Sequence, residues 1–230
     1  LGDVYKRQKY YILNNDKNKT GVPVLLNAVL AEEFNPQNPM PPMVGYSWCC
    51  AYRNERIYPD ELYLISKDRL YTFDYIRFWD GYVVSSEFLE LIKSFSSFRY
   101  NIVKLNVIGW KGVKITDKKY YFIEIPISEW IDAIDFEKSV FMLDDYMLEL
   151  KGLNKEQVIA EKNYFTNIKA YKSIHIDSSR CKNNQIFQVR DNIIQDLICS
   201  QEFLNELEKS NIYGIGVIDT NSSSEYFIYD

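Results

Sequence analysis

The chain has 230 residues, with 27 Lys and Arg against 32 Asp and Glu, which gives a formal net charge of −5. Its hydrophobic and charged fractions, 47% and 26%, are typical of folded proteins and exclude a wholly disordered chain. The negative charge argues against a protein that binds duplex nucleic acid. No apolar stretch reaches the roughly 18 residues that a membrane-spanning helix needs.

The N-terminal part of the chain is expected to hold a strand and then a helix. Residues 1–8 resemble a translated adapter sequence, so we expect a single domain over residues 9–230 that opens with a strand at Tyr10–Leu13. A helix is expected within residues 24–34. Four prolines in the seven positions 36–42 then exclude a helix or a central strand. The main body follows, with short strands or irregular segments at 43–53 and 61–66.

A weak internal repeat places two similar segments about 115 residues apart. An apolar run, a serine and an acidic helix start occur at Gly81–Leu89 and again at Asp196–Leu204. Ser85 and Ser200 are of a residue type that caps helix N-termini, so a helix is predicted to begin at each. An apolar strand follows each helix. The two predicted strand–helix–strand units have helices at 85–95 and 200–210 and closing strands at 100–108 and 212–219.

The other predicted strands form two hairpins. Strands at 102–107 and 120–125 flank a glycine-containing loop, and strands at 166–177 and 185–190 are expected to pair in the same way. A short strand at 226–229 closes the chain. Because strands outnumber helices and do not alternate strictly with them, the sequence predicts an α+β fold. We expect a mixed, largely antiparallel sheet with the two strand–helix–strand units packed on it.

Several motifs that indicate enzymes are missing from the sequence. It contains no phosphate-binding loop, no dinucleotide fingerprint and no Gly-x-Ser-x-Gly turn. The single histidine, His175, excludes sites built from several histidines. No metal or cofactor is therefore expected. The four cysteines lack metal-ligand spacing and are expected to be free thiols; they are Cys49, Cys50, Cys181 and Cys199.

Paired carboxylates leave one catalytic alternative open. Asp132 with Asp135, or Asp144 with Asp145, could serve as acid and base in a carboxylate-dependent hydrolase of unknown substrate. A deep pocket with two convergent carboxylates would favour that alternative. A flat or convex acidic face would favour a binding protein.

Charge and aromatic residues point to a protein partner. Residues 121–149 contain eight acidic residues and one lysine, which suggests a negative surface for a basic protein. Aromatic residues make up 16% of the chain, and tryptophans exposed in turns or loops often anchor interfaces. The candidate partner-binding residues are Asp132, Asp144, Asp145, Tyr146, Trp79 and Trp110.

Short motifs spread over nearly the whole chain carry a family resemblance. The most specific is Asp135-Phe136-Glu137-Lys138-Ser139, and others lie at Lys9–Leu13, Phe73–Ile76, Val84–Phe88, Tyr120–Phe122, Ile186–Val189, Ser200–Leu204 and Gly214–Val217. In these motifs the chain resembles the immunity proteins of bacterial polymorphic toxin systems, in the related immunity protein families 43 and 11. Family 11 tends to have Phe-Arg where this chain has Phe187-Gln188, which favours family 43.

The resemblance implies a non-catalytic α+β protein made beside a secreted toxin. It would bind the C-terminal domain of that toxin in the cytoplasm of the producing cell and block it stoichiometrically. The matched motifs would maintain the fold, with Asp135 and Ser139 as local hydrogen-bonding groups and Phe136 in the core. We expect a basic toxin domain as partner, and neither nucleic acid nor membrane. The oligomeric state stays open, and a glycan-binding or structural accessory module is a further alternative.

Overall fold

The computed structural model describes residues 8–43, 46–49, 56–95, 97–160, 167–181, 184–190, 194–221 and 226–227. The chain divides into two compact units. The first contains Leu1–Leu13, Ile127–Glu206 and Val217–Asp230, and the second contains Asn14–Pro126 and Leu207–Gly216. The described strands form three sheets that are antiparallel except at one pair, which confirms the predicted α+β class. The single domain over residues 9–230 stays a prediction.

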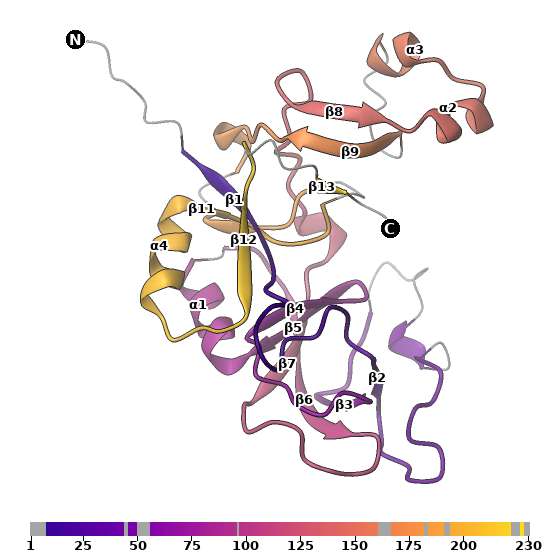
Figure 1. Ribbon diagram of the computed structural model, residues 1–230, viewed down its shortest axis with the longest axis vertical. Helices are drawn as coiled ribbons and strands as arrows, with labels where there is room; N and C mark the ends of the chain where they lie inside the picture. Colours follow the sequence, from indigo (N-terminus) through magenta and orange to yellow (C-terminus); the bar gives the residue numbers. More distant parts are fainter. Residues whose placement is uncertain are drawn as a thin grey trace. The chain divides into compact units, whose positions relative to one another are not determined.

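The second unit is built on a six-stranded mixed sheet (Figure 1). Its elements are β2 Ala28–Ala31, β3 Glu61–Ser66, β4 Tyr75–Phe78, β5 Gly81–Ser85, α1 Ser86–Phe95, β6 Asn101–Gly109 and β7 Tyr120–Glu124, with a short 3-10 helix at Ser47–Cys49. The strand order is β2-β3-β6-β7-β5-β4, and β3 runs parallel to β6. Helix α1 connects β5 to β6, while β7 lies between these strands and antiparallel to both. The predicted β6–β7 hairpin is thus confirmed.

Helix α1 forms where the sequence predicts it. The Ser85 hydroxyl accepts the backbone N–H of Phe88 at 3.2 Å, which caps the helix as expected. Phe88, Leu89 and Ile92 form its buried face. The Phe88 ring packs on Tyr75 of β4, with 5.4 Å between ring centroids. Burial of these side chains holds α1 against its own sheet.

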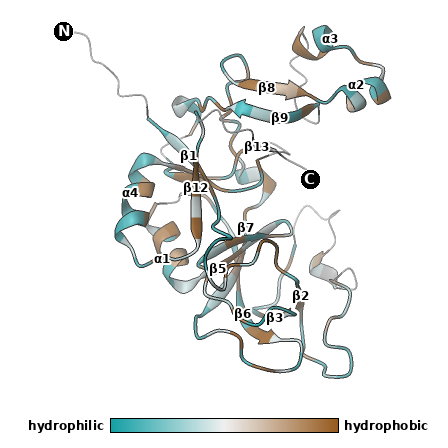
Figure 2. Cartoon of the chain, in the orientation of Figure 1, coloured by the Kyte–Doolittle hydropathy of each residue, from teal (hydrophilic) through white to brown (hydrophobic). Residues whose placement is uncertain are grey.

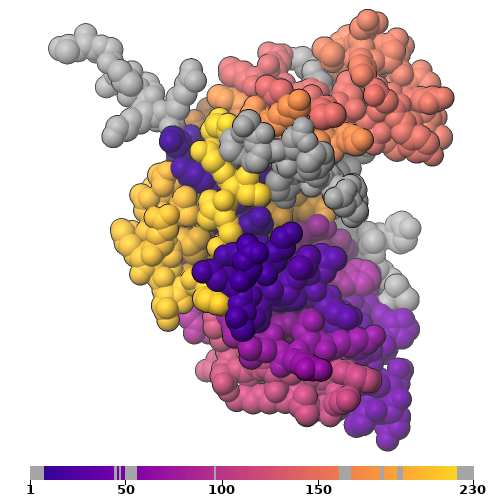
Figure 3. Space-filling model, in the orientation of Figure 1, coloured from indigo at the N-terminus to yellow at the C-terminus, as the bar shows by residue number. Residues whose placement is uncertain are grey.

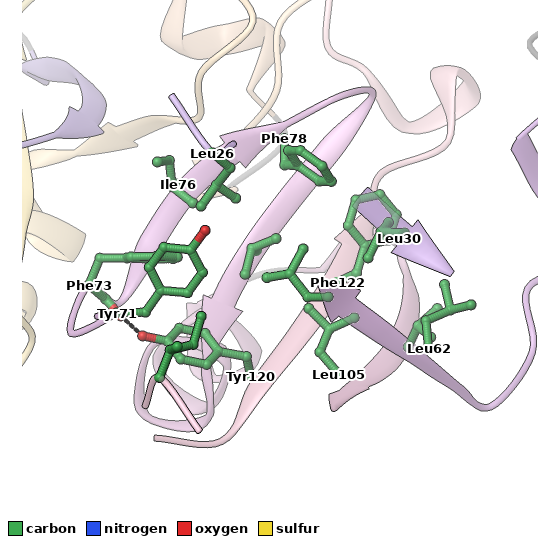
Figure 4. Packing of buried hydrophobic residues seen from close by; sticks show 14 of the residues in the cluster. Leu26, Leu30, Leu62, Tyr71, Phe73, Ile76, Phe78, Leu105, Tyr120 and Phe122 are labelled. Atoms are coloured by element: carbon green, nitrogen blue, oxygen red, sulfur yellow. Dashed lines mark hydrogen bonds between the residues drawn. The ribbon is translucent and has the colours of Figure 1, made fainter. Parts of the chain in front are cut away.

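The other face of the six-stranded sheet carries a large aromatic and aliphatic core (Figure 4). The Phe73 ring packs against two tyrosines of this core, with its centroid 5.1 Å from those of both Tyr71 and Tyr120. The Tyr120 hydroxyl donates to the Phe73 carbonyl oxygen at 2.7 Å. This bond gives the Tyr120 hydroxyl a partner in a position where the whole side chain is buried. Burial raises the pKa of Tyr120 well above its ordinary value.

The first unit carries most of a four-stranded sheet, in the order β10-β11-β1-β12, and a three-stranded sheet, in the order β13-β9-β8. The bounds of the remaining strands and helices are β1 Tyr10–Asn15, β8 Val140–Leu143, α2 Asp145–Lys151, α3 Lys155–Ala160, β9 Ile168–Ser173, β10 Ile186–Phe187, β11 Ile198–Ser200, α4 Gln201–Lys209, β12 Ile215–Asp219 and β13 Tyr226–Phe227. Three of these elements, β1, α4 and β12, lie partly in the first unit and partly in the second. Short 3-10 helices lie at Ile127–Glu129 and Ser178–Arg180.

The second predicted strand–helix–strand unit is also present. Helix α4 connects β11 to β12, and Ser200 caps it by accepting the N–H of Phe203 at 3.3 Å. Strand β1 lies between β11 and β12. It is antiparallel to β11, with Tyr10 opposite Ser200. Backbone bonds from Thr220 to Tyr10 and from Asp16 to Gly214 show that it is antiparallel to β12 as well.

Two predictions about local structure are wrong. The segment expected to be helical contains β2, whose residues pair with β3 so that Leu30 and Ala31 are buried. The predicted hairpin between 166–177 and 185–190 does not form, because β9 pairs with β8 and β13 while β10 pairs with β11. In both places the structure depends on pairing with strands that are distant in the sequence, and the local sequence pattern does not reveal those partners.

Candidate functional site

The acidic segment 121–149 lies mainly in the first unit, where it contributes the 3-10 helix at Ile127–Glu129, strand β8 and the start of α2. Its seven acidic residues from Glu129 onward belong to this unit. Their burial and hydrogen bonds separate those that stabilise the fold from those that are exposed to a partner.

Helix α2 turns an apolar stripe outward. Tyr146 and Leu150 are four residues apart, so they share one face of the helix, and they are 71% and 67% exposed. Asp145 and Glu149, also four residues apart and exposed, form an acidic stripe beside them. Leu148 is the buried residue of this helix. Figure 2 shows both hydrophobic and hydrophilic residues along α2.

These four side chains, Asp145, Tyr146, Glu149 and Leu150, are named the α2 surface below. A surface helix normally buries its apolar stripe, so an outward stripe flanked by charge is typical of an interaction site. The adjoining segments expose further apolar side chains: Val140 and Met142 of β8 are 52% and 39% exposed, and Ile159 of α3 is 54% exposed. Strand β8 is one of the two edge strands of its sheet. Atoms of β8, α2 and α3 lie at the surface in Figure 3.

Asp144 has a structural role at this site. It caps α2, with an extended backbone and its carboxylate accepting the N–H of Met147 at 3.2 Å. Gly152 ends the helix with a φ of 64°, and its N–H bonds to the Glu149 carbonyl. Asp145, the next residue, is 79% exposed at its side chain and pairs with Lys155 at 2.9 Å. The two neighbouring aspartates therefore differ: the first holds the helix and the second faces solvent.

Asp132 and the Asp135–Ser139 motif precede this surface. Asp132 is exposed, between the half-buried Ile131 and the buried Ala133. Asp135 accepts the backbone N–H groups of Glu137 and Lys138 and pairs with the Lys138 ammonium at 2.6 Å. These hydrogen bonds, with the one to the Lys138 ammonium the largest, lower the pKa of Asp135.

The end of the motif is also fixed by hydrogen bonds. The Ser139 hydroxyl donates to the Asp135 carbonyl at 2.7 Å and accepts the N–H of His175 at 2.9 Å. The local hydrogen-bonding roles expected for Asp135 and Ser139 are thus confirmed. Phe136 was expected in the core, but it is only half-buried, with its ring 6.3 Å from that of Phe141.

The two candidate tryptophans lie in the second unit. Trp79 is the first residue of the two-residue turn between β4 and β5, and it is 51% exposed. Of the described residues other than glycine, it alone has a positive φ, at 54°. A left-handed backbone brings Cβ close to the next carbonyl and costs ~1–2 kcal/mol in an L residue.

Trp110 differs from Trp79. It follows β6 directly, and its backbone N–H donates to the Ser66 carbonyl at 2.7 Å. Its side chain is 42% exposed, and the Lys111 ammonium lies 5.2 Å from the centre of the ring. A cation over one face partly covers the indole. The sequence placed both tryptophans in a turn or loop, which the structure confirms.

Three surface hollows bear on the hydrolase alternative. A hollow of about 770 Å³ in the second unit is lined by Glu87, Lys118 and Tyr213 among others. One of about 480 Å³ in the first unit contains Lys138, His175 and Asp177. Neither brings two carboxylates together. In each carboxylate pair that the sequence suggested, one member accepts backbone N–H groups and so serves the fold. These members are Asp135 and Asp144.

The third hollow was missed by sequence reasoning. It has a volume of about 430 Å³ and lies on the face of β3, β6 and β7 that carries Tyr63, Lys104 and Tyr121. Lysines at 114, 118 and 119 also line it, so it is basic rather than acidic. The signal was present as five lysines and one aspartate in residues 104–119. Three of these lysines are already paired: Lys104 with Glu61, Lys114 with Asp117 and Lys118 with Asp74.

The described residues contain no group of three His, Cys, Asp or Glu side chains that could hold a metal ion. Within the same residues, no helix combines the length and apolarity that a membrane span requires. Of the cysteines, Cys181 and Cys199 are buried free thiols and Cys49 is a half-buried one, while Cys50 lies outside the described residues.

Comparison with protein families identifies the chain. The model of the family described as immunity protein 43 matches residues 14–230. No curated protein matches it significantly. Because the family match extends over nearly the whole chain, and the resemblance noted above favoured the same family, this protein belongs to the immunity protein 43 family.

Proposed function

We propose that this chain binds the C-terminal domain of a cognate secreted toxin and neutralises it stoichiometrically in the cytoplasm of the producing cell. It would protect that cell during competition between bacteria. Family membership supports the role. The observation that carries the proposed binding site is the α2 surface, where Tyr146 and Leu150 are more than two-thirds exposed beside Asp145 and Glu149.

The partner that suits this surface is a basic protein with an apolar contact region. Apolar area excluded from water would supply most of the binding free energy, while the acidic stripe would steer encounter and fix orientation. We propose Asp132, Asp145 and Tyr146 as direct contacts. Asp144 would act indirectly, because its carboxylate caps the helix that presents them. Trp79 and Trp110 are proposed contacts on the second unit.

No catalytic role is part of this proposal. An inhibitor needs only a complementary surface, whereas a carboxylate-dependent hydrolase needs two carboxylates that converge on one pocket. Nucleic acid and membrane are likewise not part of the proposed set of partners.

The proposal predicts that a neighbouring gene encodes a secreted protein, and the C-terminal domain of that protein is the partner used in the test. Co-expression of this chain should restore growth to cells that produce the domain, and the two purified proteins should form a complex. In the double variant Asp145→Lys, Glu149→Lys, association should slow at least tenfold at low ionic strength, because the steering charge is reversed. The difference should shrink as salt is added.

The control is Glu90→Lys, which reverses an exposed helical acid of the second unit that also has a lysine partner. Its association rate should stay within twofold of the unmodified protein. Equal rates for all three proteins would contradict the role of the α2 surface. Failure of the unmodified protein to bind or protect would contradict the proposed function itself.

A further inference from the structure

The Trp79 turn holds a bulky side chain where the backbone favours glycine. Phe78 and Gly81 face each other at the end of the β4–β5 hairpin, which leaves Trp79 and Asp80 as the two turn residues. Trp79 has a φ of 54°, and Asp80 is not among the residues with positive φ. A two-residue hairpin turn with positive φ at its first position is of the type in which glycine usually occupies that position.

The hairpin holds this conformation from both sides. Phe78 is buried just before the turn, and its ring meets the indole edge to face at 6.5 Å. Asp80 pairs with Arg56 at 2.6 Å. Gly81 lies so close to β7 that an added Cβ would be 2.4 Å from the Ile123 carbonyl oxygen. The turn is therefore fixed by Phe78, Asp80 and Gly81, while Trp79 itself stays 51% exposed.

We infer that Trp79 is a preorganised anchor of the toxin interface, inserted into an apolar pocket on the toxin domain. This inference rests on the proposed function. An unfavourable backbone conformation at an exposed site indicates that the residue serves binding rather than the stability of the fold. A rigid indole loses little conformational freedom on binding, which is why tryptophan dominates many interfaces. The adjoining Asp80, 58% exposed at its side chain, suits a basic group at the rim of that pocket.

The comparison with Trp110 sharpens the inference. Trp110 is also exposed, but Lys111 lies over its ring, and its φ is not positive. Trp110 therefore lacks the unfavourable backbone conformation that distinguishes Trp79, and a cation lies over its ring. Of the two tryptophans named as contacts, Trp79 is assigned the larger share of binding.

The experiment compares folding with binding in variants of the full chain. Trp79→Gly and Trp79→Asn replace the indole with residues that accept a positive φ. Both should unfold at a temperature equal to or above that of the unmodified protein. Both should bind the toxin domain at least tenfold more weakly, mainly through faster dissociation. Trp110→Ala should weaken binding less than either Trp79 variant does. The control is Ile57→Ala, which truncates an apolar side chain of the same unit that is 85% exposed and is not a proposed contact, and it should change the dissociation constant less than threefold.

Three results would overturn the inference. Trp79→Gly and Trp79→Asn could bind within threefold of the unmodified protein, or Trp110→Ala could weaken binding as much as they do. A lower unfolding temperature in both Trp79 variants would show that the indole serves the fold. If the unmodified protein does not bind the toxin domain, the proposed function itself is wrong. If it binds but Trp79 makes no difference, only the role of Trp79 as an anchor is wrong.

Discussion

Around their capping serines, the sheets of the two units share one hydrogen-bond arrangement but differ in the side-chain pair beside it. In the second unit the Ser85 N–H donates to the Asp74 carbonyl and the Ser86 N–H donates to that of Lys119, each at 3.0 Å. In the first unit the Ser200 N–H donates to the Gln185 carbonyl at 2.8 Å, and the Gln201 N–H donates to the Lys9 carbonyl at 3.1 Å. Tyr120 faces Ser85 just as Tyr10 faces Ser200. Each sheet thus places a capping serine beside an inserted antiparallel strand.

The sequences of the inserted strands agree with this correspondence. Lys119-Tyr120-Tyr121-Phe122-Ile123 parallels Lys9-Tyr10-Tyr11-Ile12-Leu13. The difference lies one residue earlier. Lys118 pairs with the fully buried carboxylate of Asp74 at 2.5 Å, whereas Gln8 donates to the Gln185 side chain at 3.2 Å. One backbone network therefore accepts an ion pair in one sheet and an amide pair in the other.

The largest expected effect comes from removing the buried carboxylate. Asp74 also accepts the N–H of Tyr213 at 2.5 Å. Asp74→Ala therefore leaves both the Lys118 ammonium and this backbone N–H without their acceptor. We expect a loss of about 3 kcal/mol in the free energy of unfolding, at the lower end for a broken buried pair. The lower end applies because the Lys118 side chain is 29% exposed and can reach water. Urea denaturation measures the loss.

The matched variant in the other sheet is Gln185→Ala. It removes neutral hydrogen bonds at a partly exposed position, so we expect a loss of about 1 kcal/mol. Equal losses in the two variants would show that the ion pair and the amide pair are interchangeable, which the difference in burial argues against.

A smaller effect is expected at the caps, where the two sheets agree. Ser85→Ala and Ser200→Ala each remove a side-chain acceptor for the first turn of a helix, at 3.2 and 3.3 Å. We expect each to lower the free energy of unfolding by about 1 kcal/mol. Similar losses would support the correspondence between the sheets, and a loss confined to one serine would break it. The corresponding Ser→Thr variants, which keep a hydroxyl, should recover part of each loss.

Much of this shared arrangement could be predicted because its signals are local. The serine caps and the apolar faces of α1 and α4 follow from residues within one or two turns. The pairing of β1 with β11 joins residues nearly 190 positions apart, and nothing near Tyr10 indicates that partner. The hairpin wrongly expected around residue 180 fails for the same reason, since β9 pairs with β8 and β13.

The candidate site was predictable to a similar degree. Charge and residue type pointed to Asp145 and Tyr146, which the structure exposes on one short helix. Leu150 was missed, although its spacing from Tyr146 is that of one helix face. The structural role of Asp144 depends on where α2 begins, and the strain at Trp79 depends on the register of β4 and β5. Neither is visible in composition or charge.

Cys199 of β11 and Val84 of β5 stand at a position where the two sheets differ by one conservative residue. Cys199 faces Tyr11 in β1, as Val84 faces Tyr121 in β7. Cys199→Val should therefore change the free energy of unfolding by less than about 1.5 kcal/mol. Burial raises the pKa of the Cys199 thiol to about 12, so it stays protonated and unreactive at pH 8. Thiol titration should count equal numbers of reactive cysteines in the two folded proteins and one more in the unmodified protein after unfolding. An extra reactive thiol in the folded unmodified protein would show that β11 opens where the corresponding strand β5 is expected to stay closed.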